Sequence, residues 1–158
     1  MVTQADDEWL QVQLPIRPNG TTGWIRRAEV EVREVTHEIR IDLEARTLTL
    51  IDAGATVLTT PVAIGTEEAP TPTGRFSIVD KLETGRTNSA YGPYALGLSG
   101  HSEVLTEFAG GDGQIGIHGT NDPGSIGQAV SHGCIRVPDD VITQLNDILP
   151  LGTPVVIA

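Results

Sequence analysis

The stretch "HGTNDPGSIGQAVSHGCIRV", residues 118–137, contains the only cysteine of the chain and two of its four histidines. A short apolar run, "IGI", ends just before His118, and another short run, "IRV", begins just after Cys134. Such runs, separated by glycine and polar residues, predict two β-strands joined by a Gly-rich loop. Cys134 is thus expected where the loop meets the second strand, a position at which functional side chains are often held open to a ligand.

Composition narrows the class of protein. With 158 residues, of which 39% are hydrophobic and 20% charged, the chain is long enough for one globular domain with a buried core. No apolar run approaches the ~20 residues of a membrane helix, so no membrane span is predicted.

The net charge is -11 and Lys81 is the only lysine. Such a chain would repel a nucleic-acid backbone, so no nucleic-acid partner is expected.

The alternation of apolar and polar residues predicts mainly β-structure. Ile39, Ile41 and Leu43 alternate with charged residues, and the period of two continues through an "AGAT" turn into "VLTTPVAIG". Further strands are predicted after the Pro-rich loop that precedes Phe76, before His118, and in the C-terminal "PVVIA".

A single helix is predicted near the C-terminus. Apolar residues recur with helical spacing from Val141 to Leu149, Asp139 or Asp140 is the expected N-cap, and Pro150 is expected to end the helix. The predicted fold class is therefore mainly β with one short C-terminal helix.

Residues 1–34 are predicted to be a separate β-hairpin segment. Apolar and polar residues alternate on both sides of Asn19-Gly20, a strong hairpin signal, with Trp9 and Trp24 flanking the turn. The segment resembles the closing strands of a bacterial SH3-like domain and is interpreted as a possible truncated module. A hairpin alone is too small to be stable, so packing against the rest of the chain is favoured over wall binding.

The residues around Cys134 indicate thiol chemistry. A cysteine becomes nucleophilic when a neighbouring base lowers its pKa, and both His118 and His132 are candidates for that base. Gly119 and Gly133 permit close approach, so backbone N–H groups near the thiol can bind an oxyanion. The alternative without a function is a buried, unreactive cysteine, but three reactive side chains within seventeen residues favour catalysis.

A zinc site is the rival interpretation. His118, His132 and Cys134 with a water molecule would satisfy a catalytic zinc ion. The chain lacks a His-Glu-x-x-His or a paired Cys-x-x-Cys motif, so the metal site is ranked below a free thiol and no metal or cofactor is predicted.

The motif formed by His118-Gly119-Thr120 and Ser131 to Arg136, "SHGCIR", resembles the active-site motif of L,D-transpeptidases, bacterial enzymes that remodel peptidoglycan. The upstream "TPTGRFSI", residues 71–78, is similar to another segment of that family. The resemblance extends over about residues 36–158, and residues 35–158 are taken as the catalytic domain. It implies a β-sandwich-like fold.

The resemblance also implies roles for individual residues. Cys134 is the nucleophile, His118 its base, and the backbone carbonyl of Gly119 orients the imidazole. The expected site-lining and oxyanion-hole residues are Ser131, His132 and Gly133.

Three residues are candidates for substrate binding. Arg136 is expected either to bind a substrate carboxylate or to form a structural ion pair, and the structural role is favoured. Tyr91 and Tyr94 are expected either to line the donor groove or to pack beside Pro93.

The implied reaction begins with attack of the Cys134 thiolate on the diaminopimelate carbonyl of a donor stem tetrapeptide, which releases D-alanine. An amine of a second stem, or water, then resolves the thioester. Peptidoglycan stem peptides are the expected partners and carbapenem-type β-lactams the expected inhibitors. The alternatives are a secreted cysteine peptidase or amidase and a non-catalytic wall-binding module.

The expected location is the periplasm or cell wall. The initial "MVTQADDEWLQVQL" lacks the basic start and continuous apolar stretch of an export signal, so no such signal is predicted within this chain.

Overall fold

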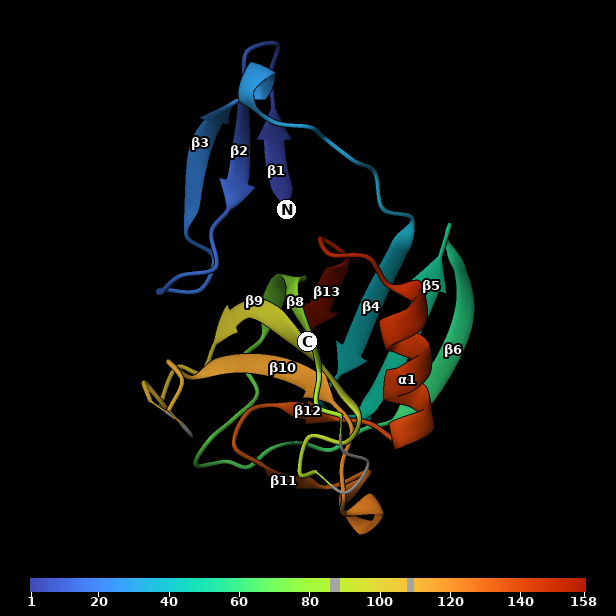
Figure 1. Ribbon diagram of the computed structural model, residues 1–158. Coiled ribbons are helices and arrows are strands. Elements are labelled where there is room, and N and C mark those ends of the chain that lie inside the picture. Colours follow the sequence, from blue (N-terminus) through green and yellow to red (C-terminus); the bar gives the residue numbers. More distant parts are fainter. Residues whose placement is uncertain (86–88, 108–109) are drawn as a thin grey trace.

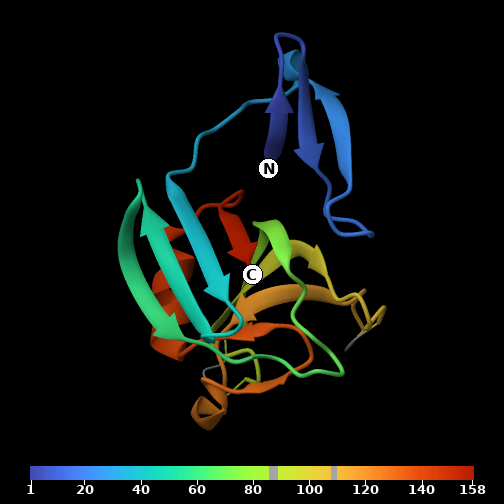
Figure 2. The same ribbon diagram turned by 180° about the vertical axis from the view of Figure 1, so that it is seen from behind.

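The computed structural model describes residues 1–85, 89–107 and 110–158. Parts of two predicted loops, at 86–88 and 108–109, lie outside the described residues. The main feature is an eight-stranded sheet with the order β12-β10-β9-β8-β13-β4-β5-β6. Figures 1 and 2 show that this sheet is strongly curled, so that its β4–β6 part and its β8–β10 part lie at an angle to each other. The predicted mainly β fold is confirmed.

The strands of this sheet are β4 (His37–Asp42), β5 (Thr47–Asp52), β6 (Ala55–Pro61), β8 (Gly74–Glu83), β9 (Tyr94–His101), β10 (Gln114–His118), β12 (Ile135–Arg136) and β13 (Pro154–Ile157). Two short strands, β7 (Ile64–Gly65) and β11 (Ala129–Ser131), form a separate parallel pair. A 3-10 turn, η2 (Pro123–Ser125), lies in the loop between His118 and Cys134.

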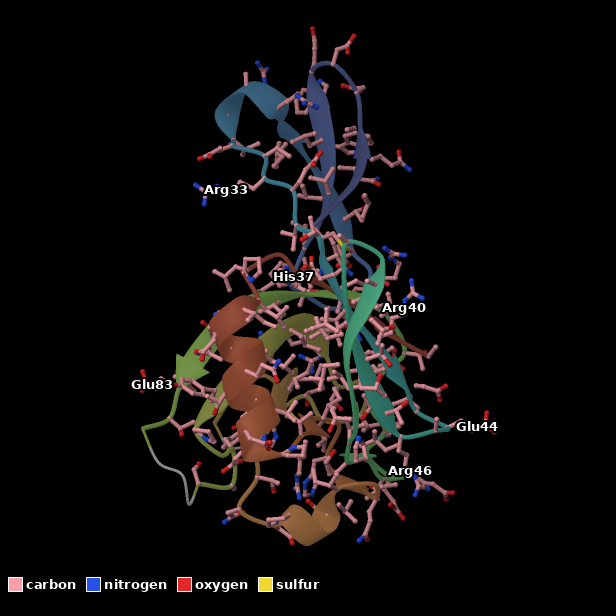
Figure 3. All side chains as sticks on the ribbon, turned by 90° about the vertical axis from the view of Figure 1, so that its right-hand side faces the viewer. Arg33, His37, Arg40, Glu44, Arg46 and Glu83 are labelled. Atoms are coloured by element: carbon pink, nitrogen blue, oxygen red, sulfur yellow. The ribbon has the colours of Figure 1, made fainter. Side chains whose placement is uncertain are left out.

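The predicted alternation of apolar and polar residues determines which side chains form the core. In the antiparallel pair β4–β5, Ile39 lies opposite Leu50 and Ile41 opposite Leu48, and all four side chains are buried. Successive residues of a strand point to opposite faces, so the charged residues between them lie outside. Figure 3 shows the side chain of Arg40, which follows Ile39, on the outer side of the sheet.

Helix α1 (Asp139–Ile148) packs its apolar face against β9 and β10, with Ile142 and Leu145 fully buried. The predicted helix is confirmed, and it ends before Pro150. The predicted cap is wrong, because the N-cap residue is Pro138 and no side chain caps the helix. The carboxylate of Asp139 instead accepts a hydrogen bond of 2.8 Å from the backbone N–H of Thr120, in the loop beside the candidate site.

Residues 1–29 form a three-stranded sheet in the order β1-β2-β3 followed by a 3-10 turn. Its elements are β1 (Val2–Ala5), β2 (Trp9–Gln13), β3 (Thr22–Arg26) and η1 (Arg27–Glu29). The predicted hairpin corresponds to β2–β3, whereas β1 was not predicted because its four residues are exposed and show no alternation. Figures 1 and 2 show this sheet at one end of the molecule, joined to β4 by an extended segment.

Within the described part of the chain, none of the helices has the length and apolar character needed to cross a membrane.

Candidate active site

Strand pairing brings the two ends of the 118–137 stretch together. β10 and β12 are parallel neighbours, with Ile117 opposite Ile135 and His118 opposite Arg136. His118 ends β10, and Cys134 immediately precedes β12. This register places Cys134 level with Gly116, two residues before His118, and both side chains line the same cavities.

The His118 imidazole is buried and held in one tautomer. Its Nδ1 lies 2.6 Å from the carbonyl oxygen of Gly119. A carbonyl only accepts hydrogen bonds, so Nδ1 carries the proton and Nε2 is left with a free lone pair. The pKa of His118 is lowered to about 4, chiefly by burial and in smaller part by the nearby Arg136 charge, while the Gly119 hydrogen bond acts in the opposite direction. His118 is therefore a neutral imidazole at neutral pH.

The carbonyl of Gly119 is positioned by close packing. A Cβ atom at this residue would clash with the Asp139 carboxylate and would lie 2.9 Å from the Cα of Gly92. Only glycine fits this space, and the same Asp139 carboxylate holds the next residue, Thr120. This arrangement has the geometry of an orienting group for the imidazole.

The Tyr91 ring packs against His118, with 4.7 Å between ring centroids and an interplanar angle of 54°. Tyr91 is itself 39% exposed, and both rings line the cavity that contains Cys134. Tyr94, in contrast, packs against the hydrophobic core and does not line either cavity at Cys134. The structure therefore brings only the first of the two predicted tyrosines to the site.

The Cys134 thiol is half-buried. Burial raises its pKa, while a hydrogen bond from the backbone of Gly116 and the charge of Arg136 act to lower the pKa. Gly116 lies in β10 next to an irregularity in the pairing of β10 with β9. Such irregularities redirect backbone groups and are common beside active sites. Sequence reasoning did not identify Gly116, because the glycine in "IGI" gives no signal that its N–H faces a sulfur atom.

Ser131 and Gly133 shape the turn before the nucleophile. The buried Ser131 hydroxyl donates to the carbonyl of Cys134 at 2.5 Å and accepts from the N–H of Gly133 at 3.1 Å. Gly133 has a φ of +115°, which an L side chain rarely adopts. The N–H of Gly133 is thus engaged with Ser131 in this conformation. His132 is exposed, and its side chain lines the cavity with Cys134.

Arg136 is the positive group of the site. Its backbone pairs with Ala63 through two hydrogen bonds of 2.9 Å, and its side chain lines the cavity with Cys134 and His118. Within residues 1–85, 89–107 and 110–158 its guanidinium forms no salt bridge, and its buried Nε has no hydrogen-bond partner. The structural ion pair favoured for Arg136 from the sequence is therefore not found among the described residues.

Two cavities meet at the thiol. One, of about 280 Å³, includes His132 and Arg136 in its lining. The other, of about 370 Å³, lies toward Asp80 and Gly97. His118 and Cys134 line both cavities.

The donor atoms do not gather as a metal site would require. In the part of the chain that the structure describes, no group of three or more His, Cys, Asp or Glu side chains is placed to hold a metal ion. His118, His132 and Cys134 therefore do not form the predicted alternative zinc site in this conformation.

Comparison with known proteins places this geometry in a family. Residues 36–157 match the L,D-transpeptidase catalytic domain, YkuD. The L,D-transpeptidase YkuD of Bacillus subtilis is 37% identical over 123 residues, which cover 78% of this chain and 66% of that relative. The chain thus spans just under two thirds of the length of this relative.

Solved structures agree with this assignment. A cysteine-to-serine variant of the Enterococcus faecium L,D-transpeptidase is 26% identical with a TM-score of 0.61, covering 78% of this chain and 50% of that one. An L,D-transpeptidase solved in complex with imipenem has the same TM-score of 0.61 at 21% identity, covering 88% and 63% of the two chains. Because the domain match covers most of the described catalytic region and more than half of the whole sequence, the chain belongs to the L,D-transpeptidase catalytic-domain family.

Proposed function

We propose that this chain is a peptidoglycan L,D-transpeptidase with Cys134 as its nucleophile and His118 as its general base. One observation carries the proposal: a neutral imidazole, fixed through Nδ1–H to the Gly119 carbonyl, lines the same cavities as the only thiol of the chain. A base oriented by a third group beside a nucleophile is the arrangement that covalent catalysis requires.

The resting site holds an uncharged pair. Burial lowers the pKa of His118 and raises the pKa of Cys134, so a thiol and a neutral imidazole are favoured over a thiolate–imidazolium ion pair. The sulfur therefore loses its proton to Nε2 of His118 as it attacks. The Gly116 N–H and the Arg136 charge stabilise the negative charge that develops on the sulfur.

The donor is a stem tetrapeptide. The sulfur forms a bond to the diaminopimelate carbonyl carbon, and the tetrahedral intermediate collapses by breaking the bond to D-alanine. The imidazolium of His118 returns its proton to the departing amine, which leaves a neutral imidazole and a thioester at Cys134. The backbone N–H of Cys134 is the oxyanion donor in this proposal, because the Gly133 N–H is already bonded to Ser131.

The acceptor is an amine of a second stem. Its nitrogen attacks the thioester carbonyl while His118 removes the proton, and the expelled sulfur then takes that proton back. The second cavity that contains Cys134 in its lining is the proposed place for the acceptor. Water in the same position would give carboxypeptidase activity.

Arg136 is proposed to bind a carboxylate of the stem peptide. A half-buried guanidinium that forms no salt bridge within the described residues has donors available for a ligand anion. Tyr91, over His118, is proposed to form a wall of the substrate site, whereas Tyr94 is assigned to packing.

Carbapenems are the proposed inhibitors, because the strained lactam carbonyl resembles the acyl donor and a family structure contains imipenem. The proposed location is the periplasm or cell wall, where the substrate lies. Residues 1–34 are proposed to be part of an SH3-like module. A packing role is favoured for them, because Gln13, Arg17 and Asn19 are hydrogen-bonded to the catalytic region.

The test is incubation with purified disaccharide-tetrapeptide, followed by mass spectrometry of the products. Cross-linked dimer with release of D-alanine is expected from the parent protein, and none from Cys134→Ala with an unchanged circular dichroism spectrum. Tripeptide without dimer would instead favour the hydrolase alternative. Full activity in Cys134→Ala would refute the proposed nucleophile.

A further inference from the structure

One wall of the active-site cavity comes from the described residues of the connection between β9 and β10, residues 102–107 and 110–113. Ser102, Leu105 and Gly113 line the cavity that contains Cys134. Its described residues are joined by contacts of their own: the Ser102 N–H donates to the Gly113 carbonyl at 2.8 Å, the Ser102 hydroxyl accepts from the Leu105 N–H at 3.0 Å, and the Asp112 carboxylate lies 3.0 Å from Nε2 of His101. A side chain from outside the family domain adds to these contacts.

The holding group is Arg17, in the loop between β2 and β3 and thus outside the matched family domain, which begins at residue 36. Its Nη1 donates to the carbonyl of Asp112 at 2.6 Å. Its Nη2 donates to the carbonyls of Ser102 and Leu105, each at 3.0 Å. One guanidinium thus ties the beginning of the connection to its end.

Neighbouring contacts fix the loop that carries Arg17. The side-chain amide of Asn19 donates to the His101 carbonyl at 2.8 Å and accepts from the His101 N–H at 2.9 Å. Gln13, at the end of β2, donates to the carbonyl of Arg75 at 2.7 Å. The N-terminal segment is therefore anchored to β8 and to the end of β9, directly before the wall that Arg17 holds.

The fit around the guanidinium is close. Gly113 has a φ of +78°, and a Cβ atom there would lie 2.8 Å from Nη2 of Arg17 and would clash with the Leu105 carbonyl. Arg17 forms no salt bridge within the described residues, so its planar fork is directed to backbone carbonyls rather than to a carboxylate. Lysine has a single nitrogen at its tip and cannot reproduce this geometry.

We propose that Arg17 is a positioning residue of the active site: from the segment before the family domain, it fixes the wall that Ser102, Leu105 and Gly113 contribute to the cavity that receives the substrate. The inference rests on the proposed function only in treating that cavity as the substrate site. Arg17 touches neither the thiol nor the imidazole. Its loss is therefore expected to affect ligand binding much more than the chemical step.

The experiment measures acylation of Cys134 by imipenem as a function of drug concentration in the full chain. In Arg17→Ala the concentration for half-maximal rate should rise about tenfold or more, since small displacements of a positioning group have effects of this size. The maximal rate should change by less than about threefold, because the reacting groups are untouched. Arg17→Lys keeps the positive charge but not the planar guanidinium, so its half-maximal concentration should lie between those of the parent and Arg17→Ala.

Arg33→Ala is the matched control. It removes the same charge from the same N-terminal region, but the side chain of Arg33 is 79% exposed and its ion pair is with Glu31, two residues away. Figure 3 shows Arg33 pointing away from the rest of the chain. This variant should behave as the parent. Equal kinetics for Arg17→Ala and Arg33→Ala would overturn the proposal, as would a fall in the maximal rate with no change in the half-maximal concentration.

A second measurement does not depend on enzymatic activity. Cys134 is the only thiol, so its modification by N-ethylmaleimide reports directly on access to the cavity. A displaced wall should accelerate modification in Arg17→Ala about tenfold over Arg33→Ala under native conditions. If the parent is not acylated by imipenem, the proposed function fails while this comparison still tests Arg17. Equal modification rates would then overturn the positioning role.

Discussion

Protonation of His118 should destabilise the folded protein as the pH falls. Burial lowers the pKa of this imidazole from 6.5 to about 4, so the unfolded chain binds a proton more readily than the folded chain between these two values. The contribution of His118 to the free energy of unfolding is therefore fully present above pH 6.5 and is lost as the pH falls through about 4. Each pKa unit corresponds to ~1.4 kcal/mol, so the total loss is about 3 kcal/mol.

The variant His118→Gln isolates this contribution, because glutamine is neutral throughout the range. We expect the difference in unfolding free energy between parent and His118→Gln to shift by about 3 kcal/mol in favour of the variant between pH 7.5 and pH 4. Urea unfolding at four pH values in this range measures the difference. His132→Gln, which removes an exposed imidazole, is the matched control and should follow the parent.

Other groups titrate in this range, but they contribute equally to parent and variant and cancel in the difference. A constant difference between parent and His118→Gln across the whole range would refute the reasoning. It would mean that the pKa of the imidazole is the same in the folded and the unfolded chain, as it is when solvent reaches the ring freely. That result would also remove burial as the basis for a neutral resting pair at the active site.

Three further outcomes are expected. His118→Ala should slow acylation by imipenem ~10²–10⁴-fold at neutral pH, and the rate should recover in part at high pH as the thiol ionises. His132→Ala should slow acylation less. If acylation rates measured against pH show the larger loss in His132→Ala, His132 is the base. A strong chelator should leave turnover unchanged, and stoichiometric metal whose removal stops turnover would reinstate the zinc interpretation. Gly119→Ala should lower the unfolding free energy by about 1–3 kcal/mol, because its Cβ would clash with the Asp139 carboxylate, and an unchanged thermal melt would contradict this packing.

The reactive residues were predictable because the chemistry is encoded locally. His118, Cys134 and the glycines beside them lie in one stretch, and the strands that carry them show the expected apolar spacing. The strands of the core were predictable for the same reason, since period-two alternation is a property of neighbouring residues. The predicted roles of these residues in the reaction remain to be tested by the variants above.

The rest of the site depends on contacts between distant residues. The hydrogen bond from Gly116 to the thiol requires the irregular pairing of β10 with β9, which no local pattern reveals. Asp139 was predicted to cap the helix, but its carboxylate is taken up by Thr120, because the loop after β10 brings that N–H within 2.8 Å. Arg17 reaches Asp112 across 95 residues of sequence. An exposed-looking arginine in a turn carries no signal of such a partner.

The burial of the proposed reacting groups also bears on how a thiol enzyme avoids reacting with molecules other than its substrate. A permanently ionised thiolate would react with any electrophile that enters the cavity, since the thiolate is the nucleophilic form. Here burial favours a protonated Cys134 and a neutral His118, so in the proposed mechanism the proton moves only when a carbonyl is placed for attack. Placing that carbonyl requires that the substrate first binds in a cavity of fixed shape. The proposed role of Arg17 belongs to this binding step, because its hydrogen bonds to three backbone carbonyls hold one wall of the cavity while the reacting groups themselves are untouched.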